Sequence, residues 1–316
     1  MAKNKIKRFF GFIYHSYIPN KRDNLKQVTI KSVFIISLTT LIVSSVFILR
    51  YFGETRSQNR IIDDDKNIWY SYDIPETDFG EETEIDQKTD TDSTPVKQMQ
   101  KKNPDFKGWV KLSNSKIDNP IYQTKDNDYY LNHNSRRQKS VYGALFFDCN
   151  NVVTQEKIDK NLVVFGHEMK NGSMFGQLKK LRELKFYKNN PTVEFTVLNR
   201  KGTYKIYAVF VLNSKAKDDG GYIYNIYRNE FSSDAAFDEW VAEAKQRSLV
   251  NTSVDVKNGD DILTLVTCSD DFKDSRLVVM ARKTRKGESK TVDISSARLN
   301  KNPKYPKAWY KAKDAK

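Results

Sequence analysis

The chain has 316 residues, of which 38% are apolar, and it carries 54 Lys and Arg against 40 Asp and Glu. The length allows one or two domains, and an apolar share below that of most globular proteins excludes a chain that is packed throughout. The net charge of +14 allows a nucleic-acid partner in principle, but the whole surplus lies after residue 97. The two cysteines, Cys149 and Cys268, exclude a disulfide framework, and the spacing of Cys and His predicts no metal site.

The first predicted element is an uncharged segment of 18 residues, 32–49, bounded by Lys31 and Arg50. As a helix it spans about 27 Å, close to the ~30 Å hydrocarbon core of a bilayer, so we predict a single-pass transmembrane anchor. Residues 1–31 hold eight Lys and Arg and one acid, so the positive-inside rule predicts a cytoplasmic N-terminus and an extracytoplasmic remainder. A cleaved signal peptide is less favoured because the apolar run exceeds the usual ~7–15 residues. This placement at the cell membrane argues against a nucleic-acid partner.

Residues 50–96 are predicted to form an acidic extracytoplasmic stalk. Twelve acids lie between Asp63 and Asp92, against Lys66 and Lys88 alone. Such a segment repels itself and has little apolar surface to bury, so an extended conformation is favoured. Residues 68–72 (IWYSY) form an apolar island within it. The sequence leaves open whether this island is a short docked helix.

Residues 97–286 change to short apolar runs separated by turn residues, which predicts a mostly β domain. Eight strands rich in Val, Ile, Tyr and Phe indicate a barrel or a sandwich. A helix is expected over 233–249, where apolar residues fall near one face, and a second over 174–183. The expected strands are 108–112, 116–122, 141–147, 161–165, 192–198, 203–212, 261–267 and 276–281.

Three residues at predicted strand ends have the chemistry for acyl transfer. Cys268 ends one apolar strand, and Arg276 begins the next after a seven-residue loop, so a hairpin would place them opposite each other on one rim. His167 follows the strand over 161–165 and would join them if its end shares that rim. Together they would supply a nucleophile, a general acid/base and a cation for an oxyanion. Taken singly, each is as well explained by a buried thiol, a turn residue or surface charge.

Two sequence blocks resemble the signatures of sortases, the membrane-anchored transpeptidases of Gram-positive cell walls. These are NLVVFGHEMKNGSMFGQLKKL (161–181) and TLVTCSDDFKDSRLVVMARK (264–283). The first, with NPDFKGWVKLSNSKIDNPIYQTKDNDYYLNHN (103–134), is similar to class B. The resemblance implies an eight-stranded sortase barrel with accessory helices, in which His167, Cys268 and Arg276 are catalytic and Thr267 contacts substrate. It leaves the stalk and a basic C-terminal tail over 287–316, which we expect to be extended, unexplained.

The implied reaction has two halves. Cys268 attacks a C-terminal sorting motif of a secreted protein to give a thioester, and an amine of a peptidoglycan precursor or a pilin then resolves it. We expect no metal and no cofactor. Cys149 departs from the family pattern and is predicted to be a partly buried thiol. Two other functions stay open: a non-catalytic wall-binding or pilus-assembly scaffold, and a cysteine peptidase that releases the acyl group to water.

Overall fold

The computed structural model describes residues 16–72, 74 and 94–314. The chain divides into two compact units, Met1–Arg60 and Ile61–Lys316. Helix α2 (Leu25–Trp69) makes up most of the described part of the first unit and ends in the second. Of the predicted cytoplasmic charges, Lys3, Lys5, Lys7 and Arg8 lie outside the described residues.

The start of α2 is fixed by a reciprocal cap. Asn24 Oδ1 accepts from the backbone N–H of Gln27 at 2.9 Å, and Gln27 Oε1 accepts from the N–H of Asn24 at 3.0 Å. The apolar segment 32–49 lies within this helix, and none of its most apolar 18-residue window is buried. The helix continues through residues 50–69, which we expected to be extended. This stretch contains no proline and a single glycine, Gly53, so nothing in its backbone interrupts the helix.

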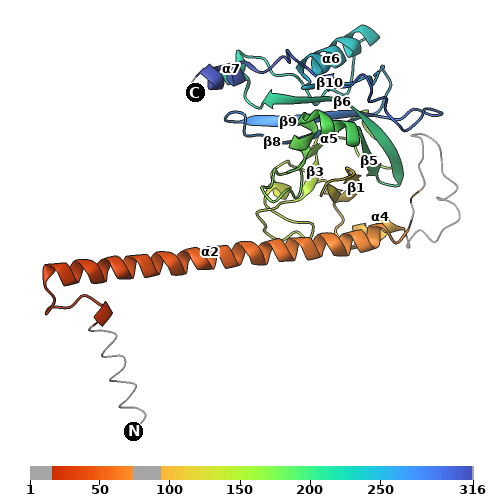
Figure 1. The fold of residues 1–316 in the computed structure, drawn as a ribbon. Helices are drawn as coiled ribbons and strands as arrows, with labels where there is room; N and C mark the ends of the chain where they lie inside the picture. The colour runs from red at the N-terminus through yellow and green to blue at the C-terminus, as the bar shows by residue number, and fades with distance from the viewer. Residues whose placement is uncertain (1–15, 73, 75–93, 315–316) are drawn as a thin grey trace. The chain divides into compact units, whose positions relative to one another are not determined.

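Eight strands close into a barrel in the order β1-β2-β3-β4-β8-β9-β6-β5 (Figure 1). The pairs β2–β3 and β4–β8 are parallel, and the other neighbours for which a register is given are antiparallel. The eight-stranded barrel is therefore confirmed. The strands are β1 (Phe106–Lys111), β2 (Asp118–Tyr122), β3 (Leu145–Phe147), β4 (Asn161–Phe165), β5 (Thr192–Val197), β6 (Arg200–Asn213), β8 (Ile262–Cys268) and β9 (Ser275–Lys283).

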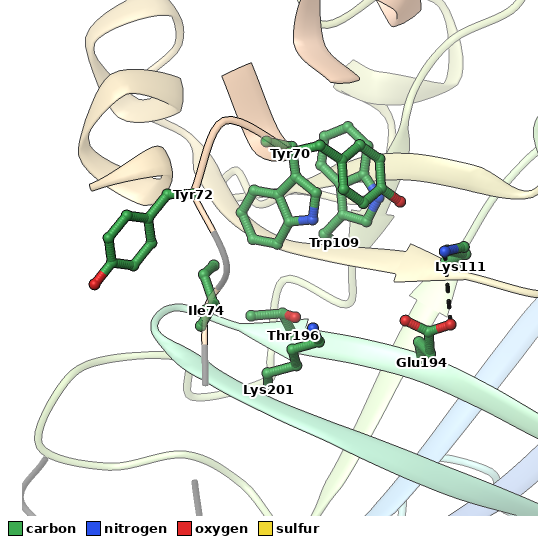
Figure 2. Close-up of a pocket in the computed structure, with 9 residues that line it drawn as sticks. Tyr70, Tyr72, Ile74, Trp109, Lys111, Glu194, Thr196 and Lys201 are labelled. Carbon is green, nitrogen blue, oxygen red and sulfur yellow. Dashed lines mark ion pairs between the residues drawn. The ribbon is translucent and has the colours of Figure 1, made fainter. Parts of the chain in front are cut away.

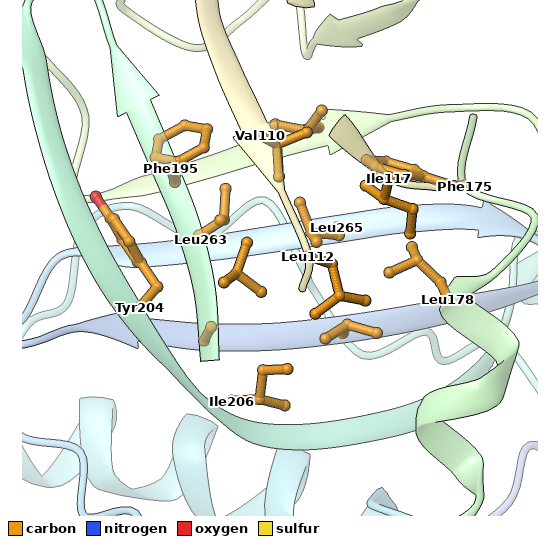
Figure 3. Packing of buried hydrophobic residues seen from close by; sticks show 14 of the residues in the cluster. Val110, Leu112, Ile117, Phe175, Leu178, Phe195, Tyr204, Ile206, Leu263 and Leu265 are labelled. Carbon is orange, nitrogen blue, oxygen red and sulfur yellow. The ribbon is translucent and has the colours of Figure 1, made fainter. Parts of the chain in front are cut away.

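The barrel strands bury both of their faces. Along β8, Leu263 and Leu265 belong to the core inside the barrel, where Figure 3 shows them gathered with residues of other strands such as Val110. Ile262 and Val266 point the other way, into a second cluster. Because both faces are covered, the strand reads as a continuous apolar run instead of an alternating one.

Helix α6 (Asp234–Arg247) covers this second face. Its N-cap is Ser233, whose hydroxyl accepts from the N–H of Ala236 at 3.2 Å, and it buries Phe237 and Trp240 against the barrel. The helix predicted over 233–249 is confirmed. The helix predicted over 174–183 is instead a 3₁₀ turn, η2 (Leu178–Arg182), followed by α5 (Leu184–Asn189). Met174 has a φ of 49°, so an α-helix cannot begin there.

The end of α2 packs on the barrel within the second unit. Trp69 is 7% exposed and stacks on Trp109 of β1, with ring centroids 4.9 Å apart. The Tyr70 hydroxyl and the Trp109 Nε1–H both donate to Asp118 Oδ1, at 2.7 and 2.8 Å. Figure 2 shows the small cavity at this seam, with Tyr70 and Trp109 in its wall. The aromatic island over 68–72 is therefore docked.

A buried carboxylate holds the same segment. The side chain of Asp65 has no exposure and pairs with Arg136 at 2.6 Å, while Lys102 of α4 (Pro95–Lys102) lies 3.8 Å away. The sequence interpretation counted Asp65 as self-repelling, whereas its partner lies 71 positions further along the chain. Residues 61–72 are therefore part of the packed unit, and most of the remaining predicted stalk, 73 and 75–93, lies outside the described residues.

The basic tail is also folded in its described part, in contrast to the extended conformation that we expected. Arg298 and Leu299 form β10 (Arg298–Leu299), which pairs with β7 (Val250–Asn251), and Ala297 is buried. Helix α7 (Lys307–Asp314) is tied to η3 (Ala216–Asp219) by the N–H of Ala308, which donates to Asp219 Oδ1 at 3.1 Å. These contacts are with distant segments, which a local apolar pattern does not reveal.

Candidate active site

Strand β8 brings Cys268 to one end of the barrel. Residues 262–267 are buried, whereas Cys268, the last residue of the strand, is exposed. The side chain leaves the packed ladder where the chain turns into the β8–β9 loop. The predicted nucleophile is therefore accessible to solvent.

Arg276 lies opposite Cys268 on β9. The two residues are register partners in the antiparallel β8–β9 pair, so their side chains leave the same face of the sheet. The guanidinium Nη1 donates to the carbonyl of Ser275 at 2.9 Å. Within the described part of the chain no carboxylate forms an ion pair with Arg276. Its charge is therefore available to a ligand.

His167 follows β4, the parallel neighbour of β8. Phe165 is the register partner of Val266, and the N–H of Gly166 donates to the Val266 carbonyl at 3.1 Å. Two positions beyond the Phe165–Val266 pair, the same register places His167 beside Cys268. The imidazole Nε2 lies 2.6 Å from the carbonyl oxygen of Leu131. Because a carbonyl oxygen only accepts, Nε2 carries a proton in this arrangement.

The three predicted residues line one cleft of about 800 Å³. The sequence placed them at strand ends, and the closed barrel brings those ends together. The sequence interpretation did not single out the other walls, which come from the segment around η1 (Tyr129–Leu131) and from the connection between β6 and α6. Apolar side chains from these segments and from the strands β3, β4 and β8 suit a peptide with uncharged residues: Leu131, Phe146, Phe165, Ile223, Tyr224 and Val266.

Thr267 also contributes to the cleft, but its side chain has a structural partner. It is 2% exposed, and its hydroxyl donates to the carbonyl of Gly166 at 2.7 Å. This bond holds the end of β4 against β8 and so fixes the backbone between His167 and Cys268. The substrate contact of Thr267 stays a prediction.

Arg182, which the sequence interpretation missed, anchors the loop that follows Cys268. Its Nη2 donates to Ser269 Oγ at 2.8 Å and to Asp271 Oδ2 at 2.5 Å, and Nη1 donates to Asp271 Oδ1 at 3.1 Å. Burial alone would raise the pKa of Asp271, but the hydrogen bonds from Arg182 and Ser269 outweigh it and lower the pKa below its ordinary value. Next to Lys179 and Lys180, nothing in the local sequence distinguishes Arg182.

Cys149 is half-buried and lies just after β3. Burial and the neighbouring Asp148 carboxylate raise the pKa of the Cys149 thiol. Since the thiolate is the reactive form, these surroundings disfavour Cys149 as a nucleophile.

Comparison with known proteins agrees with this geometry. Residues 110–284 match the family model of the sortase domain. Sortase B of Listeria monocytogenes is 32% identical over 251 residues, which cover 77% of this chain and 94% of that protein. The chain belongs to the sortase family. Its relatives are sortases B, so the class B prediction is confirmed, and this sortase is a cysteine transpeptidase.

Solved structures share the fold. A sortase B from B. anthracis is 27% identical, with a TM-score of 0.59 and coverage of 73% of this sortase and 98% of that chain. Sortase B of Clostridium perfringens is 34% identical, with a TM-score of 0.53 and coverage of 60% and 99%. Both alignments span nearly the whole of the solved chains, so the barrel is the shared part.

Proposed function

We propose that this sortase cleaves the sorting motif of a secreted protein through a thioester on Cys268 and transfers the acyl group to an amine. The observation that supports it is the arrangement of Cys268 and Arg276 as register partners, with His167 beside them in one cleft. A sorting motif and an amine acceptor are what the family implies. The amine belongs to a peptidoglycan precursor or to a pilin.

In the first half-reaction the thiolate of Cys268 attacks the carbonyl carbon of the scissile peptide bond. Arg276 stabilises the negative charge that develops on the carbonyl oxygen. His167, which took up the thiol proton at Nδ1 while Nε2 bonds the Leu131 carbonyl, donates that proton to the departing nitrogen as the C–N bond breaks, which leaves a thioester and a neutral imidazole. In the second half-reaction the acceptor amine attacks the thioester and gives a proton to His167, and the C–S bond breaks to restore the thiolate.

Intact mass of the acyl-enzyme tests this function. The full-length chain in detergent micelles is mixed with a panel of sorting-motif peptides, and peptide mapping locates any adduct. We expect an adduct on Cys268 whose mass equals that of the peptide portion before the cleaved bond, and none in Cys268→Ala. An adduct on Cys149, or no adduct with any peptide, would contradict the proposal.

The same reaction separates transfer from hydrolysis. When a primary amine is added, a transpeptidase gives an amide product, whereas a peptidase gives only the acid. A non-catalytic scaffold gives neither. The ratio of amide to acid at saturating amine therefore decides among the three functions that the sequence left open.

We further propose that residues 32–49 anchor this sortase in the cell membrane, with the N-terminus in the cytoplasm and the barrel outside. The support is the exposed apolar surface of this part of α2, where Leu41 and Phe47 are 64% and 67% exposed. Protease added to wall-stripped cells should digest the barrel. Protection of the barrel until the membrane is permeabilised would contradict this topology.

A further inference from the structure

A second, polar cavity of about 270 Å³ adjoins the catalytic cleft. Asn127 and Tyr227 line both spaces, so the cavity opens beside the cleft at a shared wall. Unlike the cleft, it is lined almost entirely by amide and carboxylate side chains. They are Asn127, Asp148, Asn150, Asn151 and Asn229, together with the ring of Tyr227.

Asp148 is the charged group of this cavity. It is 3% exposed and follows β3 directly. Its Oδ1 accepts from Asn127 Nδ2 at 3.0 Å and from both the N–H and Nδ2 of Asn150 at 3.2 Å. Among the residues that the structure describes, no Lys, Arg or His pairs with Asp148, and the neighbouring thiol of Cys149 is only a weak donor to its carboxylate. A buried carboxylate without a cationic partner is a strong acceptor for a cationic ligand.

The neighbouring amides are already engaged, so they do not neutralise this charge. Asn151 Oδ1 accepts from the N–H of Val163 at 2.8 Å, and its Nδ2 donates to the Asn161 carbonyl at 2.9 Å. Asn229 Oδ1 accepts from the N–H of Asn161 at 2.8 Å. These bonds tie the cavity wall to β4, which makes it a preformed site.

Tyr227 adds an aromatic face that a cation can contact. It is 49% exposed, and after burial the charge of Asp148 is the largest cause that raises its pKa, whereas Arg276 lowers it. Tyr227 therefore lies within the electrostatic reach of both the cavity and the catalytic cleft. A carboxylate with an aromatic ring suits a primary ammonium group. A divalent metal requires several oxygen ligands, and the described residues contain no group of three His, Cys, Asp or Glu that could hold one.

We propose that this cavity binds the protonated amino group of the acyl acceptor, with Asp148 as its anionic partner and Tyr227 as its aromatic wall. The inference rests on the proposed function, because it concerns the second half-reaction. The acceptor is held as a cation beside the thioester, loses one proton to solvent water to become the neutral amine, and gives its second proton to His167 as it attacks. The shared chemistry is a primary ammonium, which either a glycyl amino terminus or a lysine side chain supplies.

The test compares acceptors that differ in charge. Full-length wild type and Asp148→Asn are acylated with an intact sorting peptide that the wild type cleaves, and the thioester is resolved at pH 7 with triglycine, with Nα-acetyl-lysine amide or with the uncharged nucleophile hydroxylamine. Asn keeps an Oδ1 acceptor for the bonds from Asn127 and Asn150 but removes the charge. We expect the KM for the preferred cationic amine to rise at least tenfold and that for hydroxylamine to change less than twofold.

Glu156→Gln is the matched control. Glu156 belongs to the same β3–β4 connection and is exposed, and the hydroxyl of Thr154 is the first cause that lowers its pKa, but it does not line the cavity. Its loss of one negative charge should leave the KM for both kinds of nucleophile within twofold of wild type. A rise equal to that of Asp148→Asn would show a general charge effect and overturn the inference.

The remaining outcomes separate this inference from the proposed function. No thioester on Cys268 in the wild type contradicts the function itself. If the thioester forms normally but the KM for the cationic amine is equal in wild type and Asp148→Asn, the proposed role of the cavity is wrong and the proposed function stands. The same holds if the substitution raises the KM for hydroxylamine as much as the KM for the cationic amine. If Asp148→Asn fails to fold in a thermal melt, Tyr227→Leu at a half-exposed position should show the same selective rise in KM, and a uniform change would overturn the inference.

Discussion

Cys268 and Arg276 occupy one rung of the β8–β9 ladder, and the hydrogen bond from Thr267 to Gly166 holds His167 against the same rung. The proposed catalytic residues are thus placed by backbone pairing between strands, while the carbonyl of Leu131 in the cleft wall holds the imidazole of His167. Only the side chains of Cys268, His167 and Arg276 remain to be oriented. This makes conservative substitutions informative, because they change chemistry without moving the frame.

Arg276→Lys separates charge from geometry. A guanidinium presents a planar fork of donors, whereas an ammonium is a point charge on a flexible stem. We expect acylation of Cys268 in a single turnover to fall about 10²-fold or more, the scale for loss of one oxyanion donor. The thermal melt should change little because Arg276 forms no ion pair within the described chain. Near wild-type acylation would remove Arg276 from the catalytic group.

The two cysteines form a second comparison. Cys268→Ala should abolish cleavage without loss of stability, since an exposed thiol at a strand end contributes little packing. Cys149→Ala should keep at least about half of the activity because burial and Asp148 raise the pKa of its thiol. Peptide cleavage and melting temperature are measured for both. The reverse pattern of activities would assign the nucleophile to Cys149.

Because Gly143 has no side chain, the carbonyls of Tyr130 and Leu131 and the ring of His167 can pack closely against its backbone. It has a φ of 57°, and a Cβ there would lie 2.4 Å from the Tyr130 carbonyl oxygen and 3.1 Å from His167 Cδ2. Gly143→Ala therefore adds a steric clash to the ~1–2 kcal/mol cost of a left-handed residue. We expect it to lower the free energy of unfolding by about 2–4 kcal/mol and kcat/KM at least about tenfold, since displacement of a catalytic group is costly.

Gly259→Ala is the control for that substitution. Gly259 also has a positive φ, of 93°, but its Cβ would meet no atom within 4 Å. Gly259→Ala should lower the free energy of unfolding by about 1–2 kcal/mol through backbone strain alone and should keep normal turnover. Equal effects of the two variants on denaturant unfolding and on kcat/KM would mean that the close approach at Gly143 has no role in the site.

Glu288 couples the folded tail to pH. Its carboxylate accepts from Arg282 Nη1 at 2.5 Å and from Lys205 Nζ at 2.6 Å. These hydrogen bonds hold the pKa of Glu288 well below the ordinary value, and the bond from Arg282 is the largest cause. A lowered folded-state pKa gives stability that is present above the unfolded value of about 4.3 and is lost as pH falls towards the folded value. Glu288→Gln should lower the free energy of unfolding by about 1.5–3 kcal/mol at pH 7, the range for hydrogen bonds to charged groups.

Urea unfolding at a series of pH values checks this. The difference in the free energy of unfolding between wild type and Glu288→Gln should be constant near neutral pH and should shrink below about pH 4. The exposed Glu230, whose side chain has no ion pair in the described chain, supplies Glu230→Gln as a control with no expected effect at any pH. A difference that stays constant into acid would contradict the role of the Glu288 charge.

The sequence by itself determined the features that depend on near neighbours. Runs of β-branched and aromatic residues mark the strands, because each strand is a short, continuous stretch of the sequence. The helix over 233–249 was predictable for the same reason, since Phe237 and Trp240 follow a helical period. Cys268 and Arg276 were expected to face each other because only a short loop separates them.

The tertiary structure decided what depends on residues far apart in the chain. Asp65 seemed to belong to a self-repelling stalk, but it is buried against Arg136, and Arg182 reaches Asp271 across 89 positions. Asp148 lies in one run with Cys149 in the sequence, and only the closed barrel sets it beside the cleft through Tyr227. A charge has no periodic signature, and its energy depends on burial and on the partner that the fold supplies, so local sequence could not assign these roles.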